Sequence, residues 1–159
     1  MRIKHWKSLA TGLLATLAYV SPTQAADPIG NFALLDVKGD FHQLNKYGYQ
    51  DALVIVAQAN GCEANYEDNF KYKLLETDYK NANISYLMLN IAGESRDAVR
   101  QEAETFDYEW PMLIDSSQLV AESLGITKAG EVVIIDPQRM QILYRGPVQS
   151  GARANDPVR

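Results

Sequence analysis

Cysteine and histidine are scarce in this sequence. The chain of 159 residues contains one cysteine, Cys62, and two histidines. One cysteine cannot form a disulfide within the chain, so Cys62 is a buried inert thiol, a reactive thiol or a metal ligand. A structural zinc site needs four Cys or His ligands, so zinc is poorly supported. The pattern implies no bound metal and no cofactor.

Long hydrophobic runs are also missing. The apolar stretch "SLATGLLATLAYV" has 13 residues, whereas a membrane-spanning helix needs about 20. It follows the basic leader "MRIKHWK" and precedes "SPTQA", which ends in small residues. This order is typical of a secretory signal peptide over residues 1–26, cleaved after Ala25 or Ala26. We therefore expect a periplasmic or secreted protein, with an uncleaved membrane anchor as the alternative.

Positive charge is not in excess. The net charge is −5, and residues 1–26 hold three basic and no acidic side chains, so the charge without them is −8. Such an acidic domain has no electrostatic reason to bind nucleic acid or an anionic membrane surface. The sequence also lacks a phosphate-binding loop, a dinucleotide fingerprint and a serine–histidine arrangement. Cys62 is therefore the residue on which a chemical function would depend.

The spacing of apolar residues predicts one α/β domain over residues 27–147. A continuous apolar run predicts a buried strand, and three- and four-residue spacings predict helices. The expected elements, in chain order, are a hairpin over 32–44, a strand over 52–58, a helix over 63–80, a strand over 84–91, a helix over 95–106 capped by Ser95, a short extended piece over 111–115, a short helix over 116–125 capped by Ser116 or Ser117, and strands over 131–136 and 141–146. This order predicts a mixed central sheet flanked by helices. Residues 148–159 have no periodicity, which predicts an irregular or disordered tail.

Cys62 lies where the strand at 52–58 is expected to lead into the first long helix. Sites form at the carboxyl ends of strands in open α/β sheets, and the N–H groups and dipole of a helix N-terminus stabilise a thiolate. Glu63 follows directly and opposes a second negative charge. No cationic side chain lies within eight residues, so Arg145 in the last strand is the candidate to supply one. A structural, unreactive cysteine is the alternative.

Four stretches carry a resemblance to a known family: "VIVAQANGCEANY", "ISYLMLNIAGESRDAV", "WPMLIDSSQLVAESLGITKAGEVVIIDP" and "YRGPV". Through them, residues 29–147 resemble the thioredoxin-like redoxins of the alkyl hydroperoxide reductase and thiol-specific antioxidant group, in particular exported bacterial ones with a "GNGCP"-like motif. The resemblance implies a thioredoxin-like sandwich with Cys62 as the redox-active nucleophile. It also implies a thiol-dependent antioxidant oxidoreductase whose partners are a peroxide or a protein thiol or disulfide.

The sequence departs from that family at several positions. Asn65 and Ala59 stand three residues from Cys62, where a dithiol motif would place a second cysteine, so dithiol exchange within one chain is excluded. Ala59 also replaces the hydroxyl residue, and Ile55 the proline, that peroxiredoxins typically carry. Glu63 replaces the proline that follows the cysteine. In the loop that matches the cis-proline of thioredoxin-like proteins stand Ala129 and Gly130, for which we expect trans peptide bonds.

These observations favour an exported single-cysteine thiol oxidoreductase. Asn60 and Asn65 are candidates to donate hydrogen bonds to the Cys62 thiolate, together with backbone N–H groups and Arg145. The first alternative is a catalytically degenerate thioredoxin-fold protein that serves as a binding module. The second is a Cu(I) site formed by Cys62 with Met88 or Met112.

The end of the chain differs from a complete redoxin. That fold follows its last hairpin with a long helix, and here the residues after Gly146 contain Pro147, Gly151 and Pro157 and no apolar periodicity. We therefore expect the C-terminal helix to be missing and one face of the sheet to be under-covered. Such a face predicts a dimer or partner interface.

Overall fold

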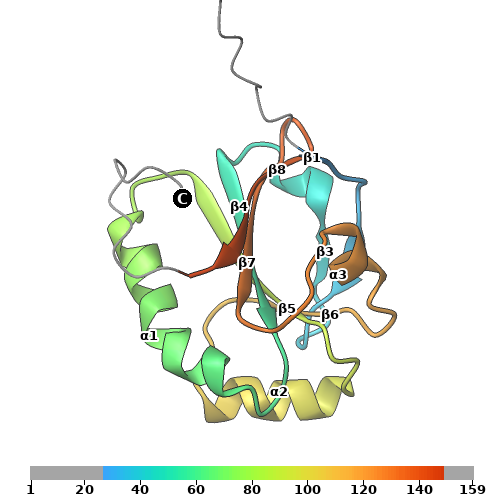
Figure 1. Ribbon diagram of the computed structural model, residues 1–159, viewed down its shortest axis with the longest axis vertical. Helices are drawn as coiled ribbons and strands as arrows, with labels where there is room; N and C mark the ends of the chain where they lie inside the picture. The colour runs from blue at the N-terminus through green and yellow to red at the C-terminus, as the bar shows by residue number, and fades with distance from the viewer. Residues whose placement is uncertain (1–26, 149–159) are drawn as a thin grey trace, which may run out of the picture.

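The computed structural model describes residues 27–148, which form a mixed sheet with helices on both faces (Figure 1). The expected signal peptide over residues 1–26 lies outside the described residues. So does the expected irregular tail, apart from Val148. Within the described part, no helix has the length and hydropathy to cross a membrane.

Six strands make up the central sheet, in the order β1-β8-β7-β4-β5-β6. Their bounds are β1 Asp27–Pro28, β4 Ala52–Gln58, β5 Ile84–Asn90, β6 Met112–Ile114, β7 Glu131–Asp136 and β8 Gln141–Pro147. Strand β4 pairs in parallel with β5 and antiparallel with β7. Because neighbours flank β4 on both edges and helices cover both faces, its apolar run is almost wholly buried. The predicted mixed α/β sheet is confirmed.

Four helical segments and a separate hairpin complete the fold. The hairpin strands are β2 Ala33–Leu35 and β3 Phe41–Gln43, and the helical segments are the 3₁₀ turn η1 Leu44–Tyr47 and the helices α1 Glu63–Asp78, α2 Arg96–Thr105 and α3 Leu119–Ser123. Ser95 caps α2 as predicted, because its side chain accepts a hydrogen bond from the Ala98 N–H at 3.3 Å. Helix α3 begins later than predicted, after Gln118. The Asp115 carboxylate accepts from the Ala121 N–H at 2.8 Å and serves this helix instead of Ser116 or Ser117.

Alternate residues of β4 feed two separate hydrophobic cores. Leu53 and Ile55 lie in one core with residues of η1 and α3. Val54 and Val56 lie in the other core with Tyr72 of α1 and Val99 of α2. Figure 1 shows α1 and α3 on opposite sides of the sheet, and Val99 places α2 in the same core as α1. Each fully buried aliphatic side chain contributes roughly 1.5–3 kcal/mol, so these two cores hold the sheet and helices together.

Strand β8 carries two large side chains that the rest of the fold does not cover. Leu143 is 57% exposed and Tyr144 is 39% exposed. Ile134 and Val148 are partly buried and pack against the core on the α1 side. The pairing of β7 with β8 shifts register between Ile134 and Ile135, next to Leu143. An apolar part of β8 is therefore open to solvent within the described residues.

Candidate functional site

The loop between β4 and α1 presents Cys62 at the start of the helix. Cys62 is the N-cap residue of α1, with φ −79° and ψ 110°, and its thiol is free and partly exposed. Its N–H donates to the Ala59 carbonyl at 3.2 Å, and its own carbonyl accepts from the Asn65 N–H at 3.1 Å. Gly61 has φ +72°, a left-handed conformation that permits the turn. The predicted placement of the cysteine between strand and helix is confirmed.

Asn65 is completely buried and holds the end of β4. Its Nδ2 donates to the Ala57 carbonyl at 3.0 Å, and its Oδ1 accepts from the Ala59 N–H at 3.4 Å. In sequence it occupies the place of the second cysteine of a dithiol motif. The amide therefore serves the backbone beneath Cys62, and its bonds found in the structure go to main-chain atoms instead of the thiol sulfur.

Asn60 also bonds away from the sulfur. Its Oδ1 accepts from Gln58 Nε2 at 3.2 Å, and its Nδ2 donates to the Ala98 carbonyl at 3.0 Å. Its backbone N–H donates to Glu94 Oε1 at 3.2 Å. Asn60 thus ties the loop before Cys62 to β4 and α2. Among the described residues, no hydrogen bond to the Cys62 thiol is formed by Asn60 or Asn65.

Arg145, the predicted cationic support of the thiolate, makes its contacts with other groups in the structure. Its Nε donates to the Leu124 carbonyl at 2.7 Å, at the end of α3. A second guanidinium nitrogen lies 3.8 Å from an Asp27 carboxylate oxygen. Leu124 belongs to the core on the α3 side of the sheet, whereas α1 packs on the other side. The guanidinium therefore binds the Leu124 carbonyl at the C-terminal end of α3.

The loop at Ala129 and Gly130 lies against the first turn of α1. The Gly130 N–H donates to the Ala57 carbonyl at 2.9 Å. A Cβ atom built on Gly130 would lie 3.5 Å from the Ala64 Cβ. The peptide bonds of the described residues are all trans. The loop therefore lies against the first turn of α1, whose N-cap is Cys62, and contains no proline.

Two carboxylates reach the Cys62 loop, although the sequence indicated neither. Glu94 Oε1 accepts the Asn60 N–H, and Glu102 Oε1 accepts the Gly61 N–H at 2.8 Å. The same Glu102 oxygen also accepts a hydrogen bond from the Tyr66 hydroxyl. From the sequence alone, Glu102, Glu104 and Asp107 together predict a solvated helix face. A signal was present, because Glu102 stands three residues after the buried Val99 and shares its side of the helix.

A buried amide pair supports the loop from below. Asn90, at the end of β5, donates from Nδ2 to Gln58 Oε1 at 2.8 Å, and Gln58 in turn donates to Asn60. Gln58 and Asn90 are opposite each other in the parallel pairing of β4 with β5 and are at most 1% exposed. Buried amides held in this way fix the strand ends on which the Cys62 loop is built.

Three tyrosines lie within electrostatic reach of Cys62. The hydrogen bond to Glu102 raises the pKa of Tyr66, and a negative charge on Cys62 would add a smaller contribution. Burial raises the pKa of Tyr72 to about 12 and also raises the pKa of Tyr108, again with a smaller contribution from Cys62. All three hydroxyls therefore stay protonated and neutral at physiological pH.

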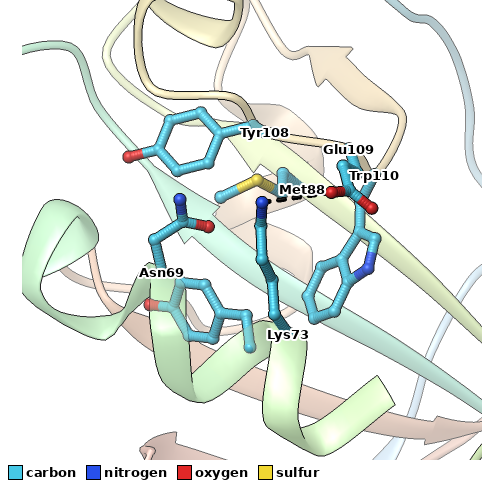
Figure 2. Close-up of a pocket in the computed structure, with 7 residues that line it drawn as sticks. Asn69, Lys73, Met88, Tyr108, Glu109 and Trp110 are labelled. Atoms are coloured by element: carbon cyan, nitrogen blue, oxygen red, sulfur yellow. Dashed lines mark ion pairs between the residues drawn. The ribbon is translucent and has the colours of Figure 1, made fainter. Parts of the chain in front are cut away.

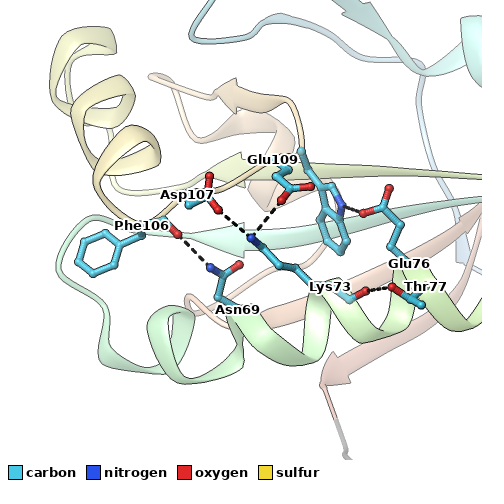
Figure 3. Close-up of polar contacts among 8 residues, drawn as sticks. Asn69, Lys73, Glu76, Thr77, Phe106, Asp107 and Glu109 are labelled. Carbon is cyan, nitrogen blue, oxygen red and sulfur yellow. Dashed lines mark hydrogen bonds and ion pairs between the residues drawn. The ribbon is translucent and has the colours of Figure 1, made fainter.

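Polar contacts fasten α1 to the segment after α2. Lys73 Nζ lies 3.0 Å from carboxylate oxygens of both Asp107 and Glu109, and Trp110 Nε1 donates to Glu76 Oε2 at 2.8 Å (Figure 3). A pocket between α1 and this segment is lined by Asn69, Tyr72, Lys73, Met88, Tyr108, Glu109 and Trp110 (Figure 2). Cys62 does not line this pocket. The thiol is partly exposed outside this pocket.

The two methionines proposed as copper ligands are core residues. Met88 and Met112 are each 1% exposed and face each other across β5 and β6. Both pack in the core on the α1 side. Within residues 27–148, no group of three or more His, Cys, Asp or Glu side chains gathers in a way that could hold a metal ion.

Comparisons with known proteins identify the fold class. No protein-family model matches the chain, and no curated protein does. Solved structures do match: a thiol-disulfide oxidoreductase from Bacteroides fragilis has 22% identity and a TM-score of 0.66 over 78% of this chain and 92% of that one. A putative thiol:disulfide interchange protein DsbE from Chlorobium tepidum has 16% identity and a TM-score of 0.67 over 80% and 87%. A hypothetical protein from Sinorhizobium meliloti has 20% identity and a TM-score of 0.68 over 84% and 75%. The fold is thioredoxin-like, as the resemblance implied.

Proposed function

We propose that this protein is an exported single-cysteine thiol oxidoreductase in which Cys62 is the nucleophile. The observation that carries the proposal is the position of Cys62, partly exposed at the N-cap of α1 and directly after the central strand of a thioredoxin-like sheet. The first N–H groups of α1 and the helix dipole stabilise a thiolate at this position. Similarity to structures described as thiol-disulfide oxidoreductases supports the reaction class.

The chemistry needs one thiolate and an external reductant. With a peroxide, the Cys62 sulfur attacks one oxygen, the O–O bond breaks, and Cys62 becomes a sulfenic acid while the second oxygen leaves as water or alcohol after taking up a proton. With a partner disulfide, the sulfur forms a mixed disulfide and one partner thiolate leaves. Since Asn65 replaces the second cysteine, two external thiols are needed to restore the sulfenic acid and one to resolve the mixed disulfide.

Trapping of the sulfenic acid tests this proposal. The protein is treated with substoichiometric peroxide in the presence of a carbon-acid sulfenic trap, and the adduct is located by intact mass and peptide mapping. We expect one trap per chain on Cys62 and none in Cys62→Ala. A wild-type protein that stays unlabelled while an unstructured cysteine peptide is labelled contradicts the peroxide reaction.

The alternative function is a redox-inactive binding module. The observation in its favour is that Asn60 and Asn65 bond to the protein scaffold instead of the sulfur and that Asn65 excludes a dithiol. The Cys62→Ala variant separates the two functions in a deletion strain of the host. A binding module keeps full biological activity without the thiol, whereas an oxidoreductase loses it.

Export and self-association are part of the proposal. The sequence of residues 1–26 supports cleavage of a signal peptide. Intact mass of the protein recovered from the periplasm should show a chain that begins at Ala26 or Asp27; the full-length mass contradicts cleavage.

The exposed Leu143 and Tyr144 of β8 support a contact with a second copy or a protein partner. Sedimentation of the wild type and of Leu143→Lys tests self-association. We expect a dimeric wild type and a monomeric variant, whereas a wild type that is as monomeric as the variant contradicts the contact with a second copy.

A further inference from the structure

Helix α2 contacts the cysteine loop at three successive points. It reaches Asn60 through Glu94 in the loop just before the helix and through the Ala98 carbonyl. It reaches Gly61 and Tyr66 through Glu102. These contacts join segments that are more than 30 residues apart in the chain, so they orient the loop relative to a separate helix instead of merely stabilising a local turn.

Glu102 bonds on both sides of Cys62. One carboxylate oxygen, Oε1, accepts the Gly61 N–H at 2.8 Å and the Tyr66 hydroxyl. Gly61 directly precedes Cys62, and Tyr66 stands one helical turn after it. The Tyr66 ring stacks on Phe106 with ring centroids 3.9 Å apart, which holds the donor in place. Hydrogen bonds to an ionised acceptor are stronger than neutral ones, and two donors converge on this one.

We propose that Glu102 is a positioning residue for Cys62. Its carboxylate fixes the Gly61 peptide and the first turn of α1, and thereby sets the direction in which the Cys62 sulfur meets its partner. The catalytic consequence rests on the proposed function of Cys62, whereas the positional part does not. Glu94 acts in the same way one residue earlier, with a longer bond of 3.2 Å to the Asn60 N–H.

The variants that test this role differ by single interactions. Glu102→Ala removes the acceptor, Glu102→Gln keeps a side-chain oxygen for the Gly61 N–H, and Tyr66→Phe removes one of the two donors. Glu104→Ala is the matched control, because Glu104 is an exposed acidic residue on the same helix that makes no side-chain hydrogen bond in the structure. Circular dichroism and thermal unfolding confirm that each variant is folded at the temperature of the assay.

The positional readout is the exchange rate of the Gly61 amide hydrogen measured by NMR. We expect this rate to rise about 10-fold or more in Glu102→Ala, because a charge-assisted hydrogen bond is lost. It should stay within about threefold of wild type in Glu102→Gln, which retains an acceptor oxygen, and be unchanged in Glu104→Ala. Gly61 exchange that is the same in Glu102→Ala as in wild type overturns the proposal, whatever the activity of Cys62.

The functional readout is the single-turnover rate of mixed-disulfide formation between Cys62 and oxidised glutathione. We expect a loss of about 10-fold in Glu102→Ala, with recovery in Glu102→Gln, since the oxygen that accepts the Gly61 N–H remains. A rate unchanged in Glu102→Ala, despite faster Gly61 exchange, overturns the positioning role. If wild-type Cys62 itself reacts no faster than an unstructured thiol, the proposed function fails while the exchange result still stands.

Discussion

At the scale of single residues, Asn65 decides which reactions the proposed oxidoreductase could carry out. It is buried at the place where a dithiol motif has its second cysteine, and it bonds to Ala57 and Ala59 at the end of β4. Asn65 thus removes the resolving thiol while it keeps the backbone beneath Cys62 in order. A mixed disulfide on Cys62 should therefore persist until an external thiol arrives.

Asn65→Cys should restore a dithiol. Residues 62 and 65 are the N-cap and third positions of α1, whose side chains lie on the same side of the first turn. We expect an intramolecular disulfide and loss of the persistent mixed disulfide with glutathione, both measured by intact mass. Because two buried hydrogen bonds are lost, the reduced variant should be less stable by about 1–3 kcal/mol.

Asn69→Cys is the matched control for this substitution. Residue 69 lies about 10 Å along the helix from Cys62, which is beyond the reach of a disulfide. It should therefore keep the persistent mixed disulfide on Cys62. If Asn65→Cys accumulates the mixed disulfide as the control does, the assignment of position 65 to the resolving site is wrong.

At the scale of elements, the β2–β3 hairpin is held by one carboxylate. Asp36 accepts the N–H groups of Lys38 and Asp40 at 2.8 and 2.9 Å, and it lies 3.1 Å from His42 Nε2. The hairpin meets the edge of the sheet through the Val37 N–H, which donates to the Met112 carbonyl at 3.0 Å. Asp36 thus shapes the turn that covers the β6 edge.

The stability contributed by Asp36 should depend on pH. Burial opposes its charged form, but the hydrogen bonds from Asp40, His42 and Lys38 outweigh burial and lower its pKa below the ordinary 3.8. A carboxylate with a lowered native pKa stabilises the fold above its unfolded pKa and loses this effect as pH falls through the native pKa. At about pH 5, Asp36→Asn should be less stable than wild type by about 1–3 kcal/mol.

Urea unfolding between about pH 5 and pH 2.5 measures this dependence. The stability difference between wild type and Asp36→Asn should shrink as the pH falls below about 3.8. Asp40→Asn, an exposed change in the same turn, serves as the control. A stability difference for Asp36→Asn that stays constant over this range contradicts the role of the charge.

Most elements could be predicted from the sequence, because periodicity reports burial directly. The strand over 52–58 was predicted to the residue, and the Ser95 cap follows from a strong local preference. The predicted caps of α3 were wrong because the helix begins after Gln118, and Asp115, directly before the expected helix, accepts the Ala121 N–H instead. The spacing from Val99 places Glu102 beside the apolar side of α2, but the loop that Glu94 and Glu102 meet could not be predicted, since it depends on how α2 packs beside α1. The same limit applies to Arg145, whose carbonyl partner lies on α3.

At the scale of the whole molecule, the sheet brings the cysteine, its supporting amides and the acidic residues of α2 to one end. Gln58 and Asn90 lie at the ends of two parallel strands, and the loops that follow these strands meet through Asn60 and Glu94. Glu102 of α2 adds a contact with Gly61. The result is a partly exposed thiol on a hydrogen-bonded support, and Cys62 does not line the pocket of Figure 2. Such an arrangement suits a partner that presents its own sulfur or oxygen at the surface.

The central claim is that the fold makes the Cys62 thiol more reactive. The most direct test compares the reaction rate of Cys62 in the folded chain with its rate in the unfolded chain. The rate of mixed-disulfide formation with oxidised glutathione is measured at pH 7 for the native chain and for the chain unfolded in urea, with Cys62→Ser as the blank. We predict that native Cys62 reacts at least about 10-fold faster, because the helix N-terminus stabilises the attacking thiolate. A native rate equal to or below the unfolded rate would contradict the account and leave Cys62 as a structural residue.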